Sequence, residues 1–367
     1  MSQSHAQLPG AVSGGPRDTT HNSAVTCRSS AAPQWSIIVI ARNEEACIGA
    51  CLESVLRTFA SRSYELIVVD SASTDRTVAI AAIFPARILQ LPETAPLRPA
   101  AGRHIGFTRS RGRWILFLDG DSTLDTDWLE EAEAAFKADP ELGGVAGEME
   151  HRLHSAESGT PVKFNQPYPD ADYEAADFLG GSAAYTREAL LKAGGFNPHL
   201  RSCEEAELGA RVRKAGYRLL RLRSIMTRHF PKHADETAPE LLRRIRRGFF
   251  VGLGQFPRYC YFQRLPVVAP FITIRRHVQF FVLAMLGLLA GTVSVVLARA
   301  EMFLAWAAGM MLVFVVFAAK SGSVRKPAYY FLEWTLASPL VIWGLVQRPR
   351  TIGEFIDTCT HGTGKET

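Results

Sequence analysis

The chain has few cysteines, and none of them are spaced as in a zinc module or a disulfide framework. Only 6 of its 367 residues are cysteine, and no two form a C-x-x-C pair. Cys47 and Cys51 are four residues apart, which would place them side by side on one helix. These features argue against a small disulfide-stapled secreted protein. We therefore expect free thiols in a reducing cytosol.

The beginning of the chain lacks a continuous apolar stretch. Residues 1–34 are rich in Ser, Gly, Ala, Pro and Thr and show no apolar period. A secretory signal peptide would need an apolar run of about 7–15 residues there. The composition instead predicts a disordered tail over residues 1–34.

Charge of one sign is not in large excess. The chain has 41 Lys and Arg residues and 36 Asp and Glu residues, which gives a net charge of +5. The arginines gather between Arg211 and Arg276, just before the most apolar part of the chain. Such a cluster suits an anionic membrane surface or phosphate groups, so we expect a membrane and no nucleic acid among the partners.

Long apolar runs occur only in the last third of the chain. As helices, Val278–Ala298 and Met302–Ala319 would span about 31 Å and about 27 Å, close to the thickness of a bilayer core. Arg275 and Arg276 precede the first run, as expected for a cytoplasmic flank. A third apolar segment, Tyr329–Val346, contains a glutamate and a proline, so it either crosses the membrane or lies re-entrant or interfacial.

Apolar runs alternate with helical periods between the tail and these segments. Trp35–Ala41, Glu65–Asp70 and Ile115–Leu118 are continuous enough for strands that are buried on both faces. A helical period begins at Ile48, between the first two runs. This order predicts an α/β protein with a three-layer sandwich and right-handed crossovers.

Polar residues follow each of these strands. Arg42 and Glu44 come after the first strand, Asp70 ends the second, and Asp119 and Asp121 follow the third with one glycine between them. Each alone could be a turn former or a helix cap. Because α/β sheets bind ligands at the carboxyl ends of their strands, we expect these side chains to gather at one edge. Two neighbouring acids there suit Mg²⁺ or Mn²⁺ and the diphosphate that such a metal carries.

Three motifs together resemble the family 2 glycosyltransferases. They read S-I-I-V-I-A-R-N-E-E, I-V-V-D-S-A-S-T-D-R-T and I-L-F-L-D-G-D. The resemblance covers about Trp35–His229. It implies the glycosyltransferase-A fold and a nucleotide-diphosphate sugar as the donor, with a UDP-sugar expected. The chain departs from the family at Ile40, where proline is usual, and at His104, where asparagine is usual.

The resemblance implies a role for the residues along the predicted sheet edge. Those that would contact the donor are Ala41, Arg42, Glu44, Asp70, Arg103 and Asp119. Among them, Asp70 would hydrogen-bond the base and Arg103 would lie near the ribose or the diphosphate. Asp119 and Asp121 would form the metal site, with Mg²⁺ or Mn²⁺ as the cofactor.

The second half of the domain contains the candidate catalytic base. Acids begin a predicted helix after Cys203, which the helix dipole favours by itself. Following G-G-F, they also resemble the family's acceptor-base motif, with E-E in place of the usual E-D. The resemblance makes Glu205 the base and Glu204 its companion. It also makes His229 a candidate near the diphosphate or metal, with a structural role as the alternative.

Transfer of a sugar to an acceptor hydroxyl requires one carboxylate and one metal ion. An acceptor hydroxyl has a high pKa and needs a base as it attacks the anomeric carbon, and a single displacement inverts that centre. A metal neutralises the charge that builds on the leaving diphosphate. Gly180 and Gly181, in a strand-like run over Phe178–Thr186, would leave room for a sugar against the backbone. The irregular stretch up to about Asp172 is assigned to an acceptor loop.

The predicted organisation places the tail at residues 1–34 and the catalytic domain at residues 35–232. A basic interfacial linker follows at 233–276, with one helix expected over Pro239–Phe250. A transmembrane region of two or three helices is expected at 277–346, and a C-terminal tail at 347–367. The Q-x-x-R-W motif of processive synthases is missing, which favours single-sugar transfer.

The sequence thus predicts an inverting, metal-dependent glycosyltransferase in the inner membrane, with its catalytic domain in the cytoplasm. The acceptor would be lipid-linked or membrane-proximal, in the synthesis of cell-envelope glycans or glycolipids. Two alternatives stay open. One is transfer to a polyprenyl phosphate, which needs no strong base at Glu205. The other is a membrane scaffold whose catalytic domain is degenerate.

Overall fold

The computed structural model describes residues 32–151, 163–164, 173–229, 237–265 and 269–355. These residues belong to one compact unit. Residues 1–31 of the predicted tail and most of the predicted acceptor loop lie outside the described residues.

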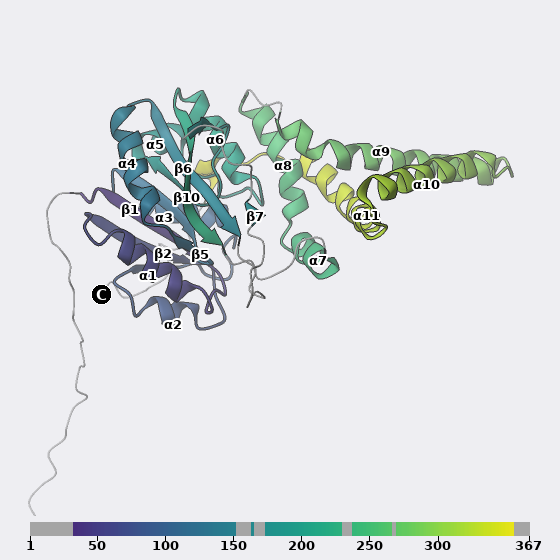
Figure 1. Cartoon of the computed structure of the whole chain (residues 1–367). Coiled ribbons are helices and arrows are strands. Elements are labelled where there is room, and N and C mark those ends of the chain that lie inside the picture. Colours follow the sequence, from purple (N-terminus) through teal and green to yellow (C-terminus); the bar gives the residue numbers. More distant parts are fainter. Residues whose placement is uncertain (1–31, 152–162, 165–172, 230–236, 266–268, 356–367) are drawn as a thin grey trace, which may run out of the picture. The chain divides into compact units, whose positions relative to one another are not determined.

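Parallel strands form the first half of the sheet (Figure 1). β1 (Trp35–Ala41) lies between β2 (Tyr64–Asp70) and β4 (Trp114–Asp119), and β3 (Arg87–Gln90) pairs with β2. Consecutive side chains of β1 point to opposite faces, yet its first five residues are all buried. Both faces of β1 are therefore covered, as predicted for a strand within an α/β sandwich.

The second half of the sheet is mixed. β9 (Ala183–Thr186) runs antiparallel to β4 and β6 (Leu142–His151), and β10 (Arg218–His229) runs parallel to β6. Three short strands complete it, namely β5 (Ser122–Leu124), β7 (Lys163–Phe164) and β8 (Tyr173–Ala175). The strand-like run expected from Phe178 begins only at Ala183, because the chain bends at the residue pair just before it.

The helices of this part are α1 (Ile48–Thr58), α2 (Thr77–Ala81), α3 (Pro99–Arg109), α4 (Asp127–Ala138), α5 (Arg187–Ala193) and α6 (Glu204–Lys214). α3 contacts β1 and β2, whereas α4 contacts β6 and β10. α3 begins with Pro99. Proline is favourable at this position because an N–H in the first helical turn has no acceptor within the helix, so its absence costs no hydrogen bond. These helices bring α3 and the start of α6 to the site described below.

The C-terminal helices are α7 (Ala238–Arg246), α8 (Phe249–Phe262), α9 (Ala269–Val296), α10 (Glu301–Ser321) and α11 (Arg325–Val346), followed by the short η1 (Ile352–Glu354). The single helix predicted over Pro239–Phe250 is wrong in its second half. It ends at Arg246, and α8 starts after Gly248, whose φ of 72° is left-handed and interrupts the helix.

α8 and α11 cross at very close range. A Cβ on Gly254 of α8 would collide with the carbonyl oxygen of Val341, and a Cβ on Gly344 of α11 would collide with that of Val251. Glycine at both positions therefore allows the backbones of α8 and α11 to contact each other directly. α11 is held against α8 in this way and buries Glu333.

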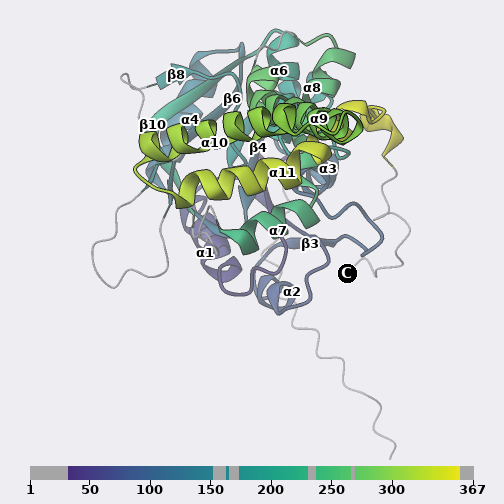
Figure 2. The same cartoon turned by 90° about the vertical axis from the view of Figure 1, so that its right-hand side faces the viewer.

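α9 and α10 differ from α11 in their surroundings. They contact each other and lie side by side in both views (Figures 1 and 2). Ile274–Val296 and Glu301–Ser321 are long and apolar enough to cross a membrane, and their apolar side chains are largely exposed. Within the described residues, α11 does not pass that test, so two of the three predicted segments have the character of membrane spans.

Candidate active site

The carboxyl ends of β1, β2 and β4 meet, as the sequence predicts. In their parallel register, Ala41 is opposite Asp70, and Ile40 is opposite Asp119. Asp121 follows two residues after the end of β4. The residues expected to border a donor thus lie along one edge of the sheet.

The segment after β1 is tied to the segment after β2. Asn43 adopts a φ of 56°, which asparagine tolerates better than most residues. Its Oδ1 accepts a hydrogen bond from the Thr74 amide at 2.8 Å, and the Glu44 amide donates to Thr77 Oγ1 at 2.7 Å. These bonds fix Arg42 and Glu44 beside the end of β2.

Asp70 presents a buried carboxylate at this edge. Its Oδ2 accepts a hydrogen bond from the Ser73 amide at 3.0 Å. Its Oδ1 has no hydrogen-bond partner among the described residues, although the side chain is fully buried. A buried acceptor without a donor costs about 1–3 kcal/mol, so an N–H group of a ligand would be favourable here. This geometry suits the predicted contact with a base.

Arg103 is the centre of the site. This side chain of α3 is 2% exposed and lies 2.8 Å from Asp119 Oδ1, 3.0 Å from Glu204 Oε1 and 3.4 Å from Glu205 Oε1. Burial by itself lowers the pKa of Arg103, but Asp119, Glu205 and Glu204 together raise it. The guanidinium therefore stays charged and joins the sheet edge to the start of α6.

Gly181 makes this arrangement possible. A Cβ there would lie 2.8 Å from Asp119 Oδ2 and closer still to Arg103 Nη2. Gly180 next to it has open space where a Cβ would be. Gly181 is thus required by the ion pair between Arg103 and Asp119, and Gly180 leaves the free space that the sequence suggested for a sugar.

Glu204 and Glu205 occupy the first turn of α6, where the helix dipole favours carboxylates. The Glu204 side chain is 6% exposed, whereas the Glu205 side chain is 24% exposed. Burial and the neighbouring charge of Glu205 together raise the pKa of Glu204 to about 8, against the opposing charge of Arg103. Glu204 therefore favours its protonated form, and Glu205 is the more accessible of the two side chains.

Asp121 and His229 form the second polar cluster. The end of β10 brings His229 Nε2 to 3.1 Å from Asp121 Oδ2. Burial lowers the pKa of His229, but its hydrogen bond to Asp121 and the charge of that aspartate raise it overall. Asp121 Oδ1 is buried with no hydrogen-bond partner among the described residues.

This pair fits a divalent cation that takes its other ligands from a donor. The described residues contain no cluster of three or more His, Cys, Asp and Glu side chains able to hold a metal. Mg²⁺ is usually held by one or two carboxylates together with substrate phosphates and water, so Asp121 is a suitable protein contribution, with His229 hydrogen-bonded beside it. Asp119, the other predicted metal ligand, is engaged by Arg103.

One arginine near the donor edge was not recognised in the sequence. Burial lowers the pKa of Arg247, and so do the charges of Arg243 and Arg42, while Glu240 and Glu44 act in the opposite direction. Arg247 therefore lies close to residues that follow β1. No local signal could reveal this, since about 200 residues separate the two segments.

Comparison with known proteins identifies the family of one part of the chain. Residues 36–194 match the family model for Glycosyl transferase family 2. These residues form a family 2 glycosyltransferase domain. The predicted donor-edge residues all lie within this glycosyltransferase domain, whereas Glu204, Glu205 and His229 follow the matched region.

Similar curated proteins are also glycosyltransferases. An uncharacterized glycosyltransferase of Haemophilus influenzae is 29% identical over 178 residues, which are 46% of this chain and 58% of that protein. A PGL/p-HBAD biosynthesis glycosyltransferase of Mycobacterium bovis is 36% identical over 110 residues, or 28% of this chain and 42% of that protein. The chain thus spans about half the length of these relatives.

A solved structure with the same fold extends beyond the glycosyltransferase domain. The mannosyltransferase PcManGT of Pyrobaculum calidifontis, in complex with GDP-Man and Mn²⁺, aligns with a TM-score of 0.51 and 17% identity. The alignment covers 86% of this chain and 88% of that one. The fold is glycosyltransferase-A, followed by C-terminal helices, as the sequence predicts.

Proposed function

We propose that the protein is a membrane-anchored, metal-dependent, inverting glycosyltransferase. It moves a sugar from a nucleotide-diphosphate donor to a lipid-linked or membrane-proximal acceptor. The observation that carries this proposal is the position of Arg103, which touches Asp119 at the donor edge and Glu204 and Glu205 at the start of α6 at 2.8–3.4 Å. A donor and the candidate bases thereby share one site.

In this proposal Glu205 is the catalytic base. Its carboxylate takes the proton of the acceptor hydroxyl while that oxygen forms a bond to the anomeric carbon. The bond from the anomeric carbon to the diphosphate breaks, and its electron pair leaves with the nucleotide diphosphate. Arg103 holds Asp119 and the start of α6 in place, and protonated Glu204 keeps the negative charge around Glu205 low.

Asp121 and His229 would hold Mg²⁺ or Mn²⁺. When bound, such an ion neutralises the charge that develops on the leaving diphosphate. Asp70 would accept a hydrogen bond from the heterocyclic base of the nucleotide, while Arg42 and Glu44 would border the nucleotide. PcManGT is described with GDP-Man and Mn²⁺, and we extend that class of donor and metal to this chain, with a UDP-sugar as the first candidate.

The membrane placement rests on α9 and α10. Their exposed apolar surfaces suit lipid, and Arg275 and Arg276 near the start of the first span suit a cytoplasmic flank. We infer an inner-membrane protein whose catalytic domain faces the cytoplasm. A role in cell-envelope glycan or glycolipid synthesis is supported by relatives named for the biosynthesis of PGL/p-HBAD and of succinoglycan.

The test is thermal stabilisation of the purified full chain by a panel of nucleotide diphosphates, with Mn²⁺ or with a chelator. We expect a metal-dependent rise in melting temperature with one nucleotide, and loss of that rise in Asp121→Ala. An absence of stabilisation by every nucleotide would favour the degenerate scaffold instead.

A second variant separates the two transfer reactions. Glu205→Gln should retain metal-dependent donor binding but lose transfer, because no base remains for an acceptor hydroxyl. Full turnover in Glu205→Gln would refute the role of Glu205. It would favour transfer to a polyprenyl phosphate, whose ionised oxygen needs no base.

A further inference from the structure

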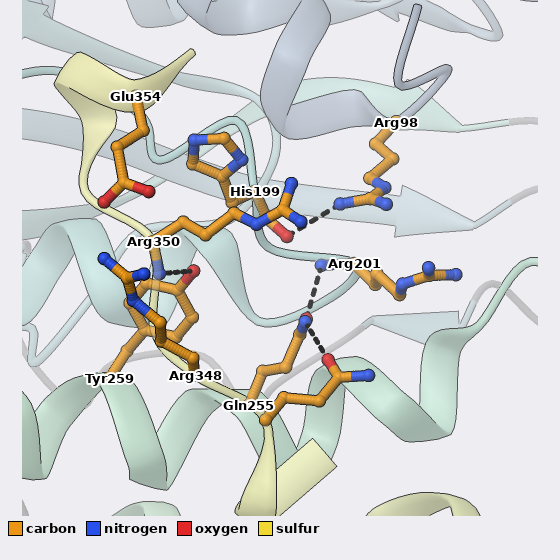
Figure 3. A pocket seen from close by; sticks show the side chains of 9 residues that line it. Arg98, His199, Arg201, Gln255, Tyr259, Arg348, Arg350 and Glu354 are labelled. Atoms are coloured by element: carbon orange, nitrogen blue, oxygen red, sulfur yellow. Dashed lines mark hydrogen bonds between the residues drawn. The ribbon is translucent and has the colours of Figure 1, made fainter. Parts of the chain in front are cut away.

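A second polar cavity lies apart from the candidate active site. Its volume is about 540 Å³, within the range of small-molecule sites. Four arginines line it, which are Arg98, Arg201, Arg348 and Arg350, together with a single carboxylate, Glu354 (Figure 3). None of the residues predicted to bind the donor, the metal or the acceptor lines this cavity.

The cavity is built where several distant segments meet. Arg98 immediately precedes α3, and its Nη1 donates to the carbonyl oxygen of His199 at 2.7 Å. The Arg201 amide donates to Gln255 Oε1 of α8 at 3.3 Å, and the Arg350 amide donates to Tyr259 Oη of the same helix at 2.8 Å. Backbone and side-chain hydrogen bonds therefore hold the walls in place, and those of Arg201 and Arg350 use the amide and not the guanidinium group (Figure 3).

The charge within these walls is not balanced. Four of the five charged side chains in these walls are arginines, and the fifth is the carboxylate of Glu354. Glu354 instead accepts hydrogen bonds from the backbone amide and hydroxyl of Thr351, at 3.0 and 3.1 Å. Burial and the charges of Arg201 and Arg350 together lower the pKa of Arg98 to about 10. Arginines that repel one another in this way favour an anion between them.

His199 gives an independent indication of a ligand. It lines the cavity and is 8% exposed, yet its Nε2 has no hydrogen-bond partner among the described residues. Burial and the charge of Arg350 lower the pKa of this histidine. A buried polar atom with no partner is costly unless a bound molecule completes it.

We propose that this cavity binds the phosphate or diphosphate group of a ligand other than the sugar donor. Arginine forks match phosphate oxygens and can bind them in a bidentate manner. The ligand is either the headgroup of an anionic lipid or a soluble phosphate compound. Arg98 is five residues before Arg103, and Arg201 is three residues before Glu204, so a bound phosphate would also brace the two segments that carry the active site.

The first experiment measures binding of inorganic pyrophosphate to the purified full chain by calorimetry, in chelator so that a metal-dependent donor site does not contribute. The test variant is the double substitution Arg348→Gln with Arg350→Gln. Both side chains are exposed, so this variant should fold as the wild type does. Arg258→Gln is the matched control, since Arg258 is an exposed arginine of α8 that does not line the cavity.

The second experiment identifies the source of the phosphate. The same proteins are placed in nanodiscs of phosphatidylcholine alone or mixed with phosphatidylglycerol, and their melting temperatures are compared. We expect at least a tenfold loss of pyrophosphate affinity in the double variant, or loss of its stabilisation by phosphatidylglycerol. The arm that responds distinguishes a soluble phosphate from a lipid headgroup.

Asp121→Ala separates this proposal from the proposed transfer reaction. Pyrophosphate binding or lipid stabilisation that survives in Asp121→Ala but is lost in the double variant supports a separate site. Wild-type responses of the double variant in both arms would overturn the proposal, whatever the outcome for donor binding.

Discussion

Replacing Arg103 by methionine would remove the only cation within ion-pair distance of Asp119, Glu204 and Glu205 among the described residues. Removing one partner of a buried ion pair costs about 3–5 kcal/mol, because the remaining charge is left buried without compensation. Glu204 has a raised pKa, and Asp119 and Glu205 are partly exposed, so we expect the lower limit of about 3 kcal/mol.

That cost should be visible as a fall in melting temperature. For a domain of this size, 1 kcal/mol corresponds to about 2–4 °C, so Arg103→Met should melt about 6–12 °C below the wild type. The assay is thermal unfolding of the full chain in detergent, followed by tryptophan fluorescence. Lower pH should reduce the difference, since protonated carboxyl groups no longer need the guanidinium.

Arg111→Met is the matched control. Arg111 is 74% exposed and lies 3.5 Å from Glu65 in a surface ion pair, which contributes at most about 1 kcal/mol. Its melting temperature should change by no more than about 4 °C. The account of Arg103 is refuted if both variants melt together, or if the deficit of Arg103→Met does not depend on pH.

Three other predictions address the site and the helices. The folded protein keeps a proton on Glu204 that the unfolded chain releases near pH 4.5. Wild-type stability should therefore fall relative to Glu204→Gln as pH rises from about 4.5 to about 8. A constant difference in melting temperature across that window would contradict the raised pKa. Gly254→Ala should destabilise the folded protein by about 1–3 kcal/mol, because α8 and α11 must separate to admit the methyl group. Gly309→Ala is the control and should not lower the melting temperature, since Gly309 has open space around it. Equal melting temperatures of the two variants would argue against the close crossing. Asp70→Ala should weaken nucleotide binding about tenfold, the effect of losing one hydrogen bond of about 1.4 kcal/mol, and unchanged affinity by calorimetry would remove Asp70 from the base contact.

Much of the fold follows from local patterns in the sequence. Continuous apolar runs predicted β1, β2 and β4, because strands covered on both faces need apolar residues at every position. Parallel pairing then places Ala41, Asp70 and Asp119 at one edge whatever the details of packing. Helix boundaries were less predictable, since one glycine conformation at Gly248 divides the expected helix into two.

The contacts that make a site depend on elements far apart in the chain. Arg103 meets Glu204 across 101 residues, and Asp121 meets His229 across 108 residues. The sequence indicated each of these residues by its type and position, but it could not indicate which acid faces which cation. The arginine cavity had no sequence signal, because its walls come from segments that are unrelated in sequence.

The sequence by itself therefore determined the parallel strands, the polar residues at their ends and the apolar segments, since each depends on the residue types within a short window. Only the tertiary structure decided that Arg103 joins the donor edge to α6, that Glu204 is buried while Glu205 is accessible, and that four arginines share one cavity. Burial and pairing of charges depend on which side chains the completed fold brings together, and local periodicity carries no information about that.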